Sequence, residues 1–424
     1  MNRSLKETNI PWIGQVPEDW SITKIGTEFK LRNNKVDDIS FPPLSVTKQG
    51  IVPQLDTAAK TDAHDNRKQV LAGDFVINSR SDRKQSCGLS TLSGSVSLIN
   101  SVLFQKADTY GSDYVGYLFK NYGFAEEFYR WGHGIVADLW TTGWDEMKGI
   151  SIPLPSKDEQ VRIVKAIKSK EEKINALITN EEKQIEKLKA YKQALISEVV
   201  TKGLDPNVPM KDSGVEWIGK IPVDWSCHRF KFIINSLRKG SGITKDLVNL
   251  FGDIQCIRYG EIYSKYDEYV ISTFSKTFLN NIKAPQFIKK GELLFACTGE
   301  LVEEIGKNIA YMGDEPCLAG GDIIIANHSQ NPRFLNYALN SQYSQKQKSY
   351  GKAKLKVVHI YSRDIANLKI AIPNSEVQKS IADYLDNLCL NLNDLINNKL
   401  SKIDYLKQYR QSIIYEYVTG KKEV

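Results

Sequence analysis

The sequence predicts an α+β fold in which two globular units of mixed helix and sheet alternate with two long helices. Three observations support this prediction. A long helical pattern occurs twice, at residues 158–199 and 371–418, a short tryptophan-containing element occurs twice upstream of these patterns, and short strand-like runs broken by glycines fill the segments between them. The chain therefore repeats one plan, in which a globular unit precedes a long helix.

The first helical pattern contains neither Pro nor Gly and is rich in Lys, Glu, Ala, Leu and Ile, which favour helix. Pro155-Ser156 before acidic residues is a start signal, and Gly203 with Pro206 is an end signal. Apolar residues recur mostly every three, four or seven positions, which predicts one seam facing a partner helix. The seam comprises Ile163, Ile167, Ile174, Ile178, Ile185, Leu188, Leu195 and Val199. Such a helix is about 63 Å long, at about 1.5 Å per residue.

The second pattern repeats the first at a constant offset. The matched pairs include Pro155 and Pro373, Gln160 and Gln378, Ile163 and Ile381, Leu177 and Leu395, and Tyr191 and Tyr409. The elements Trp12-Ile13-Gly14 with Asp19-Trp20 and Trp217-Ile218-Gly219 with Asp224-Trp225 also match. This internal repeat predicts two related units.

The repeat predicts four segments and an approximate two-fold axis. These segments are a first globular unit at 1–155, a first long helix at 156–203, a second globular unit at 204–375 and a second long helix at 376–424. We expect the helices to form an antiparallel intramolecular coiled coil, because two matched seams in one chain have a high effective concentration for each other. Pairing with helices of other chains is the alternative.

Composition limits the location and the partners. The N-terminal segment lacks the apolar run of a signal peptide, and no stretch is apolar for long enough to span a membrane, which predicts a soluble protein without a membrane partner. The six cysteines show no C-x-x-C spacing, which fits core positions in a reducing cytoplasm. Of the formal net charge of +7, the segment 206–375 contributes +6, with 22 basic and 16 acidic residues. This balance permits a nucleic-acid partner without requiring one.

Familiar catalytic and cofactor motifs are absent from the sequence. There is no P-loop pattern, no H-E-x-x-H and no G-x-S-x-G, and the five histidines show no metal-ligand spacing. Asn331-Pro332-Arg333-Phe334 differs by one residue from the Asn-Pro-Pro-Phe element of amino-methyltransferases. We interpret it as a proline-initiated helix start. The sequence therefore favours a protein without catalytic activity, cofactor or metal of its own.

Several loops carry side chains suited to an anionic partner. A lysine-rich stretch between 346 and 356 contains no acid, and we expect its members Lys352, Lys354 and Lys356 to meet phosphates. Other loops combine Arg, Lys and Gln beside glycines, side chains that can pair with base edges. These candidates are Lys48, Gln49, Arg80, Arg83, Lys84 and Gln85 in the first unit and Arg258 and Tyr259 in the second. The alternative for each is a solvated loop.

Two divergent globular units, each opened by the Trp-Ile-Gly element and each followed by a proline and glutamine at the start of a long helix, resemble the specificity subunit of Type I restriction-modification systems. The resemblance covers essentially the whole chain. It implies two target recognition domains that each read one half of a bipartite double-stranded DNA site. It also implies two modification (methyltransferase) subunits, which bring S-adenosylmethionine, and restriction subunits that join them.

Two other functions are compatible with parts of the sequence. A tethering coiled-coil protein would explain the helices but not the paired, divergent globular units. A self-contained methyltransferase or nuclease is opposed by the missing motifs. The repeated segments are the constant part of the plan, so we expect them to bind the methyltransferase subunits and the divergent units to bind DNA.

Overall fold

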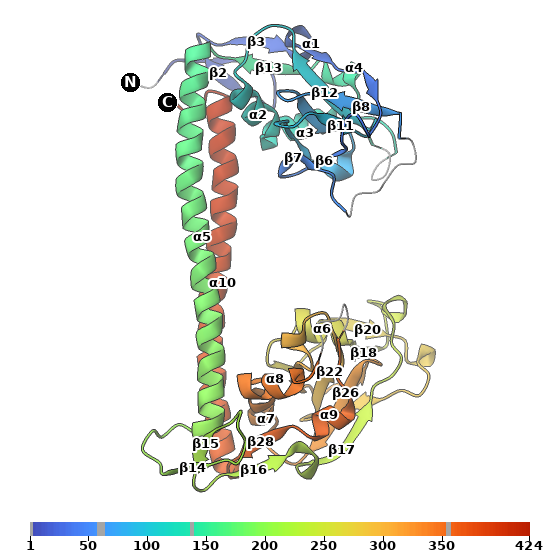
Figure 1. Cartoon of the computed structure of the whole chain (residues 1–424), viewed down its shortest axis with the longest axis vertical. Helices are drawn as coiled ribbons and strands as arrows, with labels where there is room; N and C mark the ends of the chain where they lie inside the picture. The colour runs from blue at the N-terminus through green and yellow to red at the C-terminus, as the bar shows by residue number, and fades with distance from the viewer. Residues whose placement is uncertain (1–2, 57–63, 136–139, 353–357) are drawn as a thin grey trace. The chain divides into compact units, whose positions relative to one another are not determined.

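The two predicted long helices are present in the computed structural model, which describes residues 3–56, 64–135, 140–352 and 358–424. They are α5, Lys157–Lys202, and α10, Ser375–Val418 (Figure 1). The second begins four residues after the start of its sequence repeat, because 369–372 form a strand. Contacts group the chain into two compact units, 1–182 with 400–424 and 183–399, and each unit holds part of both helices. The division at 155, 203 and 375 stays a prediction.

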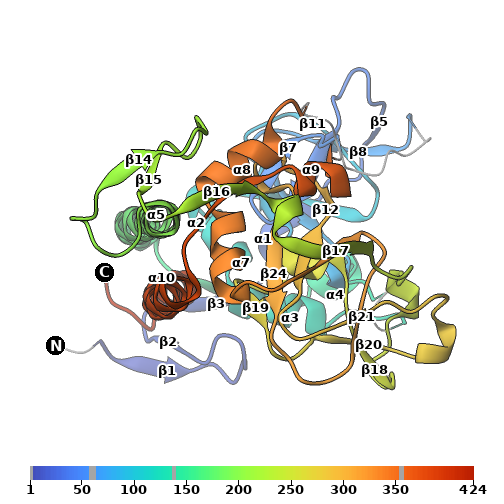
Figure 2. The same ribbon diagram turned by 90° about the horizontal axis from the view of Figure 1, so that it is seen from below.

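In each unit the segments of α5 and α10 run side by side and antiparallel (Figures 1 and 2). Two hydrogen bonds per unit establish this direction: Arg410 to Asn175 (2.8 Å) and Lys402 to Glu181 (2.6 Å) in the first, Lys192 to Asn393 (2.9 Å) and Lys399 to Gln184 (2.5 Å) in the second. The bonded pairs of one unit are the repeat equivalents of those in the other. The predicted antiparallel coiled coil is confirmed within each unit.

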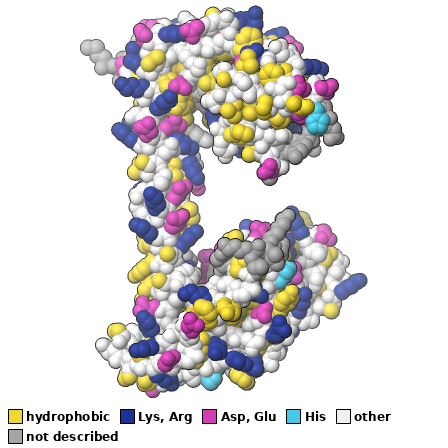
Figure 3. Space-filling model, viewed as in Figure 1, with side chains coloured by type: hydrophobic (Ala, Val, Ile, Leu, Met, Phe, Trp, Pro, Cys, Tyr) yellow, Lys and Arg dark blue, Asp and Glu magenta, His cyan; other side chains and the backbone are white. Residues whose placement is uncertain are grey.

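The predicted seam is buried at its isoleucines. Ile163, Ile174 and Ile185 are at most 6% exposed, and Ile396 and Ile403 on α10 are also buried. Such apolar burial is the main source of stability in paired helices. The exposed surface of the helices carries both signs of charge (Figure 3).

The first unit combines short strands with helices that cover them. Its sheets are ordered β10-β9-β12-β4, β11-β8-β5, β6-β7, β13-β3 and β1-β2. The strands are β1 Leu5–Glu7, β2 Gln15–Pro17, β3 Ser21–Lys24, β4 Phe29–Leu31, β5 Lys35–Val36, β6 Leu44–Thr47, β7 Gly50–Pro53, β8 Arg67–Val70, β9 Phe75–Asn78, β10 Cys87–Leu89, β11 Gly94–Val96, β12 Asn100–Gln105 and β13 Ser151–Leu154. The shorter helices are α1 Ile25–Glu28, η1 Ser81–Arg83, α2 Ser112–Lys120, α3 Tyr122–Arg130 and α4 Trp144–Met147.

The second unit follows a related plan with longer sheets. Their orders are β17-β26-β22-β24-β19, β20-β18-β25-β21, β16-β28, β14-β15 and β23-β27. The strands are β14 Met210–Asp212, β15 Lys220–Pro222, β16 Ser226–Arg229, β17 Ile234–Lys239, β18 Ile254–Ile257, β19 Tyr269–Val270, β20 Ser275–Thr277, β21 Phe287–Ile288, β22 Leu293–Ala296, β23 Thr298–Gly299, β24 Asn308–Tyr311, β25 Cys317–Ala319, β26 Ile323–His328, β27 Val358–His359 and β28 Lys369–Ile372. The shorter helices are η2 Phe230–Phe232, η3 Lys245–Leu247, α6 Tyr259–Ser264, η4 Leu279–Asn281, η5 Val302–Glu304, α7 Pro332–Asn340, α8 Gln342–Ser349 and α9 Ser362–Ala366.

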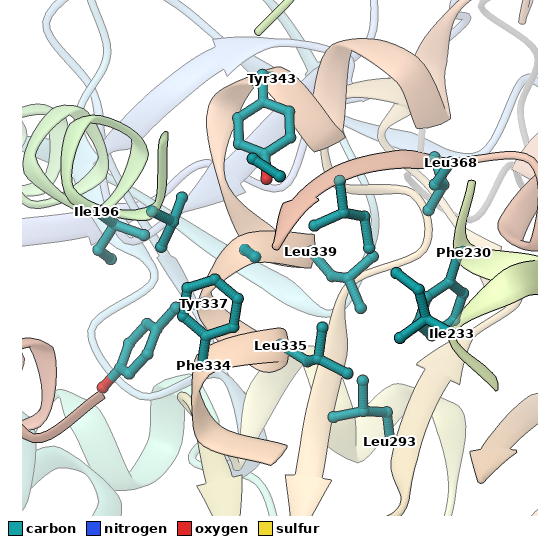
Figure 4. Close-up of a cluster of buried hydrophobic side chains, with 14 of the residues drawn as sticks. Ile196, Phe230, Ile233, Leu293, Phe334, Leu335, Tyr337, Leu339, Tyr343 and Leu368 are labelled. Atoms are coloured by element: carbon teal, nitrogen blue, oxygen red, sulfur yellow. The ribbon is translucent and has the colours of Figure 1, made fainter. Parts of the chain in front are cut away.

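In the second unit, a continuous apolar core joins the sheets to the long helices. Phe334 and Leu335 of α7 lie between Ile196 of α5 and Leu293 of β22 (Figure 4). All four side chains are at most 4% exposed. Burying a side chain of this size contributes about 1.5–3 kcal/mol. The globular part of the unit is therefore anchored to the helix that enters it.

The repeated glutamines perform the same task in both units. The Gln160 side chain accepts a hydrogen bond from the Gly111 N–H (2.7 Å) at the start of α2 and donates to the Pro155 carbonyl (3.0 Å). Gln378 likewise accepts from the Asn331 N–H (3.0 Å) at the start of α7 and donates to the Pro373 carbonyl (2.9 Å). Each glutamine thus satisfies backbone groups exposed by the start of a helix. The sequence match here reflects shared structure.

The Asn331 element is a helix start, as predicted. The Asn331 side chain accepts hydrogen bonds from the N–H groups of Arg333 (3.0 Å) and Phe334 (3.1 Å), and Pro332 occupies the first turn. The Arg333 guanidinium pairs with Asp383 (2.7 Å) and with Asp386 on α10. The arginine therefore joins α7 to the long helix.

The lysine-rich stretch between 346 and 356 is not a uniformly exposed surface. Lys348 on α8 is 1% exposed and donates to the Gly306 carbonyl (2.6 Å) and to Asn308 Oδ1 (3.0 Å). Burial lowers the pKa of its amine to about 7. Lys348 is therefore not a solvated cation like the lysines expected to meet phosphates, because its aliphatic chain packs α8 against the sheet.

Within the described ranges, no helix combines the length and apolar character needed to cross a bilayer. The six cysteines are free thiols, and all except Cys227 are buried, as predicted for core residues. Among the same residues, no cluster of three or more His, Cys, Asp or Glu side chains is arranged to hold a metal ion.

Candidate nucleic-acid interface

The loop after β9 in the first unit holds the candidates Arg80, Arg83, Lys84 and Gln85. Asp82 lies between the two guanidiniums, 3.4 Å from Arg80 Nε and 3.5 Å from Arg83 Nε. Lys84 Nζ is 3.0 Å from Glu126 on α3. These ion pairs are solvent-exposed and individually weak, so an anionic ligand can compete for the cations.

The backbone of this loop is held in place. The Tyr129 hydroxyl donates to the Asn78 carbonyl (3.0 Å), and the Asn78 side chain accepts from the Arg80 N–H (3.0 Å). The Ser81 N–H donates to the Trp140 carbonyl (3.0 Å). Gln85 has φ 63°, a left-handed conformation that reverses the chain into β10. A fixed loop presents its side chains at low conformational cost.

The second group of first-unit candidates lies at the tip of the β6–β7 hairpin. Lys48 and Gln49 are exposed, and the Thr47 hydroxyl both accepts from the Gln49 N–H (3.1 Å) and donates to the Gly50 carbonyl (2.9 Å). A Cβ on Gly88 would come within 3.1 Å of the Gly50 Cα, so the hairpin packs closely on β10. The hairpin and the loop at 80–85 are therefore both next to β10, because the loop leads directly into this strand.

Arg258 and Tyr259 lie in a basic cleft of about 910 Å³ in the second unit. Four cationic side chains line it, against two acidic ones. The cationic residues are Lys239, Lys245, Arg258 and Lys265, and the acidic residues are Glu261 and Asp322. Glycines 240, 242, 260, 320 and 321 form much of the remaining wall. A ligand can therefore approach the backbone closely here.

The buried Glu261 orients Arg258. Its carboxylate accepts from the Arg258 N–H (2.8 Å) and from the Ser275 hydroxyl, and it lies 3.4 Å from Arg258 Nη2. The Arg258 side chain is 28% exposed. The accessible part of its guanidinium can therefore donate hydrogen bonds to a ligand in the cleft.

The structure brings some predicted residues together and leaves others apart. Arg80, Arg83, Lys84 and Gln85 share one loop, and Arg258 and Tyr259 share the cleft. Lys352 Nζ lies 3.1 Å from the Asp364 carboxylate, while Lys354 and Lys356 lie outside the described residues. Sequence reasoning missed Lys239, Lys245 and Lys265, because the cleft is assembled from three separate chain segments. In the sequence, only the glycine pair at 240 and 242 gave a weak indication of this cleft.

Residues 222–405 match the family model described as Type I restriction modification DNA specificity domain. The specificity subunit of Type I restriction enzyme MjaVIII from Methanocaldococcus jannaschii is 26% identical over 65% of this chain, and that match spans 62% of the relative. The putative MjaX specificity subunit from the same organism is 22% identical over 96% of this chain and 95% of its own length.

A chain from a solved structure on complex assembly and conformational transition of the type I R-M system has the same fold. Its TM-score is 0.66, with 16% sequence identity over 96% of this chain and 99% of that chain. The resemblance and the mixed fold predicted from the sequence are both confirmed. Residues 222–405 are thus similar to the Type I restriction modification DNA specificity domain, and the chain as a whole is similar to Type I restriction enzyme specificity subunits.

Proposed function

We propose that the chain is the sequence-specific DNA-binding subunit of a Type I restriction-modification complex. Each globular unit reads one half of a bipartite double-stranded DNA site. The paired helices set the spacing between the halves and bind two methyltransferase subunits, which restriction subunits then join. The chain itself is not catalytic and acts in the cytoplasm, and the methyltransferase subunits bind S-adenosylmethionine.

The repeat is the observation that carries this proposal. The helix-to-helix hydrogen bonds and the glutamine contacts occur in both units, whereas the loops and clefts of the globular parts differ. A shared framework with divergent surfaces suits two readers of different sequences held by one scaffold. A tether alone would not require the basic cleft or the candidate loops.

Exchanging residues 25–150 for the same segment of a relative tests independent reading. We expect the methylated sequence to change in one half and to stay unchanged in the other, because the candidate DNA contacts of each unit come from its own loops. Mapping of methylated adenines in a host that expresses the hybrid provides the measurement. A hybrid that altered both halves would contradict independent reading.

Arg258→Ala and Lys245→Ala should affect DNA binding differently. The Arg258 guanidinium is held by Glu261, 3.4 Å from its Nη2, so its loss should cost about 1–3 kcal/mol and relax the preference at one base pair. Lys245 is exposed and lines the cleft, so its loss should weaken binding to all DNA sequences alike. It should also reduce by about one the slope of the logarithm of the binding constant against the logarithm of the salt concentration. Salt titrations on matched and single-substituted duplexes provide the measurement. The assignment fails if Lys245→Ala changes base preference and Arg258→Ala does not.

Each unit also carries an exposed apolar pair beside the helix seam. In the first unit, the bond between Arg410 and Asn175 places their neighbours Tyr409 and Leu177 at the same level, and these are 42% and 46% exposed. We call this pair the Leu177–Tyr409 patch. Leu177 precedes the seam residue Ile178, and Tyr409 precedes Arg410, which bonds across the helix pair to Asn175. In antiparallel helices, residues that precede such inward-facing positions lie on the same side of the pair.

The second unit holds the equivalent Tyr191–Leu395 patch. The hydrogen bond between Lys192 and Asn393 places Tyr191 and Leu395 at the same height along the helix pair. These two residues are 55% and 49% exposed. The two patches are repeat equivalents. Large apolar side chains at matched exposed positions are typical of protein interfaces. We therefore propose that each patch binds one of the two methyltransferase subunits.

A further inference from the structure

The second unit exposes an apolar ridge outside the surfaces described above. The ridge consists of Leu250, Phe251, Phe274 and Phe278, with Lys276 between the last two. Leu250 and Phe251 are 79% and 88% exposed, and Phe274 is 61% exposed. Single exposed apolar residues are common on protein surfaces, but a group of this size marks a contact surface. The ridge lies on two adjoining segments, 249–252 and 274–278, which a backbone hydrogen bond joins.

The backbone of the ridge is fixed. The Asn249 N–H donates to the Lys276 carbonyl (2.9 Å), and the Asn249 side chain accepts from the Phe251 N–H (2.9 Å). A Cβ on Gly252 would come within 2.5 Å of the Thr277 backbone, so the turn packs directly on β20. Leu250 and Phe251 therefore project from a turn that is already ordered, which lowers the entropic cost of binding.

Strand alternation places the other ridge residues on one face. Along β20 and its flanking residues, Phe274, Lys276 and Phe278 are exposed, whereas Ser275 and Thr277 are buried. The Tyr266 hydroxyl accepts from the Phe274 N–H (3.1 Å) and the two rings pack with centroids 5.5 Å apart. A cation between two phenylalanines on one strand face makes the ridge amphipathic.

The segment that carries the ridge contains more cations than acids, although Asp253 lies beside the ridge and accepts from the Leu279 N–H (2.8 Å). Residues 238–290 contain nine Lys or Arg and five Asp or Glu, and Glu261 among the acids is already committed to Arg258 and Ser275. Lys265 Nζ lies 5.6 Å from the Phe274 ring centroid. The turn also follows directly on the cleft, since the Val248 N–H donates to the carbonyl of the cleft residue Lys245 (3.3 Å). The ridge thus borders the basic cleft.

We propose that this ridge is a DNA wedge in which Phe251 stacks against an opened base step while Lys276 and the cleft lysines meet phosphates. The proposal rests on the DNA-binding function argued above. Proteins that unstack DNA insert apolar side chains such as Phe and Leu between base steps and hold the flanking backbone with cations. A protein partner on the same ridge would bury Lys276 and Lys265 among phenylalanines, whereas phosphates neutralise both lysines.

The test uses the chain assembled with its methyltransferase subunits. The probe is a duplex carrying the site identified by mapping methylated adenines, with 2-aminopurine placed at successive positions in and beside each half other than the methylated adenines, because methyltransferases flip their target base out of the stack. Unstacking raises the fluorescence of this base analogue. The variant is Phe251→Ala, and the matched control is Phe232→Ala, a phenylalanine of the same unit that is 72% exposed on η2.

We expect bound wild-type complex to raise the fluorescence at one position and Phe251→Ala to abolish that rise, with affinity lower by roughly tenfold. Phe232→Ala should behave as wild type. The wedge is overturned if bound wild-type complex brightens no position, or if Phe251→Ala keeps the rise. It is also overturned if Phe251→Ala loses a methyltransferase subunit instead, because the ridge is then a protein interface. Failure of the wild-type complex to bind the duplex would overturn the proposed function as well.

Discussion

Leu177→Glu combined with Tyr409→Glu is expected to remove one methyltransferase subunit from the complex and to leave the other bound. Both residues are large, apolar and exposed in the free chain, and neither makes the seam contacts that hold the helices together. Truncating or charging central apolar anchors of an interface commonly costs 2 kcal/mol or more per residue. Two such changes should therefore reduce affinity at that patch by at least about a thousandfold.

The second patch provides an internal comparison. Tyr191→Glu with Leu395→Glu should remove the other subunit, and the fourfold variant should bind none. Ala176→Glu, an exposed change next to Leu177 but facing away from the seam, is the matched control and should keep both subunits. Native mass spectrometry gives the stoichiometry of each complex. Retention of two subunits by the fourfold variant would show that docking occurs elsewhere.

The long helices could be predicted from the sequence because the signals that define a helix come from residues close together in the chain. Apolar spacing, the absence of Gly and Pro, and the glycine after Lys202 define α5 without knowledge of any distant residue. The apolar spacing could not show that a charged residue is also buried between the two helices. Glu181 is 4% exposed and is neutralised by Lys402, a residue more than 200 positions away. The burial of a charged residue between the helices can be explained only when its partner on the other helix is known.

The globular parts were predictable as a class but not in detail. Many of their strands are two to four residues long and pair with distant partners, as β13 does with β3 and β28 with β16. Segments this short carry little periodic signal. The basic cleft has the same difficulty, because Lys239, Arg258 and Asp322 meet only through the sheet order. The sequence therefore predicted Arg258 and Tyr259 as candidates but not the three lysines and two carboxylates around them.

Lys348 shows how a charge pattern can mislead. Its neighbours in the lysine-rich stretch suggest a solvated phosphate-binding run, yet α8 turns this one side chain into the core. Residues on opposite faces of a helix have opposite environments even when they are adjacent in sequence. Charge counts along the chain therefore identify candidate segments, and burial selects among their members.

Lengthening both helices by four residues is expected to widen the preferred spacing of the DNA site by one or two base pairs and leave both half-sites unchanged. Insertions after Glu182 in α5 and after Lys399 in α10 would keep the helix-to-helix hydrogen bonds of each unit, including Lys402 to Glu181 and Lys192 to Asn393. Four residues add about 6 Å and about 40° beyond a full turn. One or two base pairs, at about 3.4 Å each, are the nearest match in DNA.

The same four residues inserted only in α5 are the control. The partner helix then lacks matching residues, and because four is not a whole heptad the seam positions that follow the insertion, beginning with Ile185, must re-pair at a different register. We expect this variant to unfold at lower temperature, whereas the doubly lengthened chain retains its stability. Methylation of a DNA library that varies only the spacer, together with thermal unfolding of both variants, provides the measurement. If the doubly lengthened chain reads both halves at the original spacing, the helices do not set the distance between them.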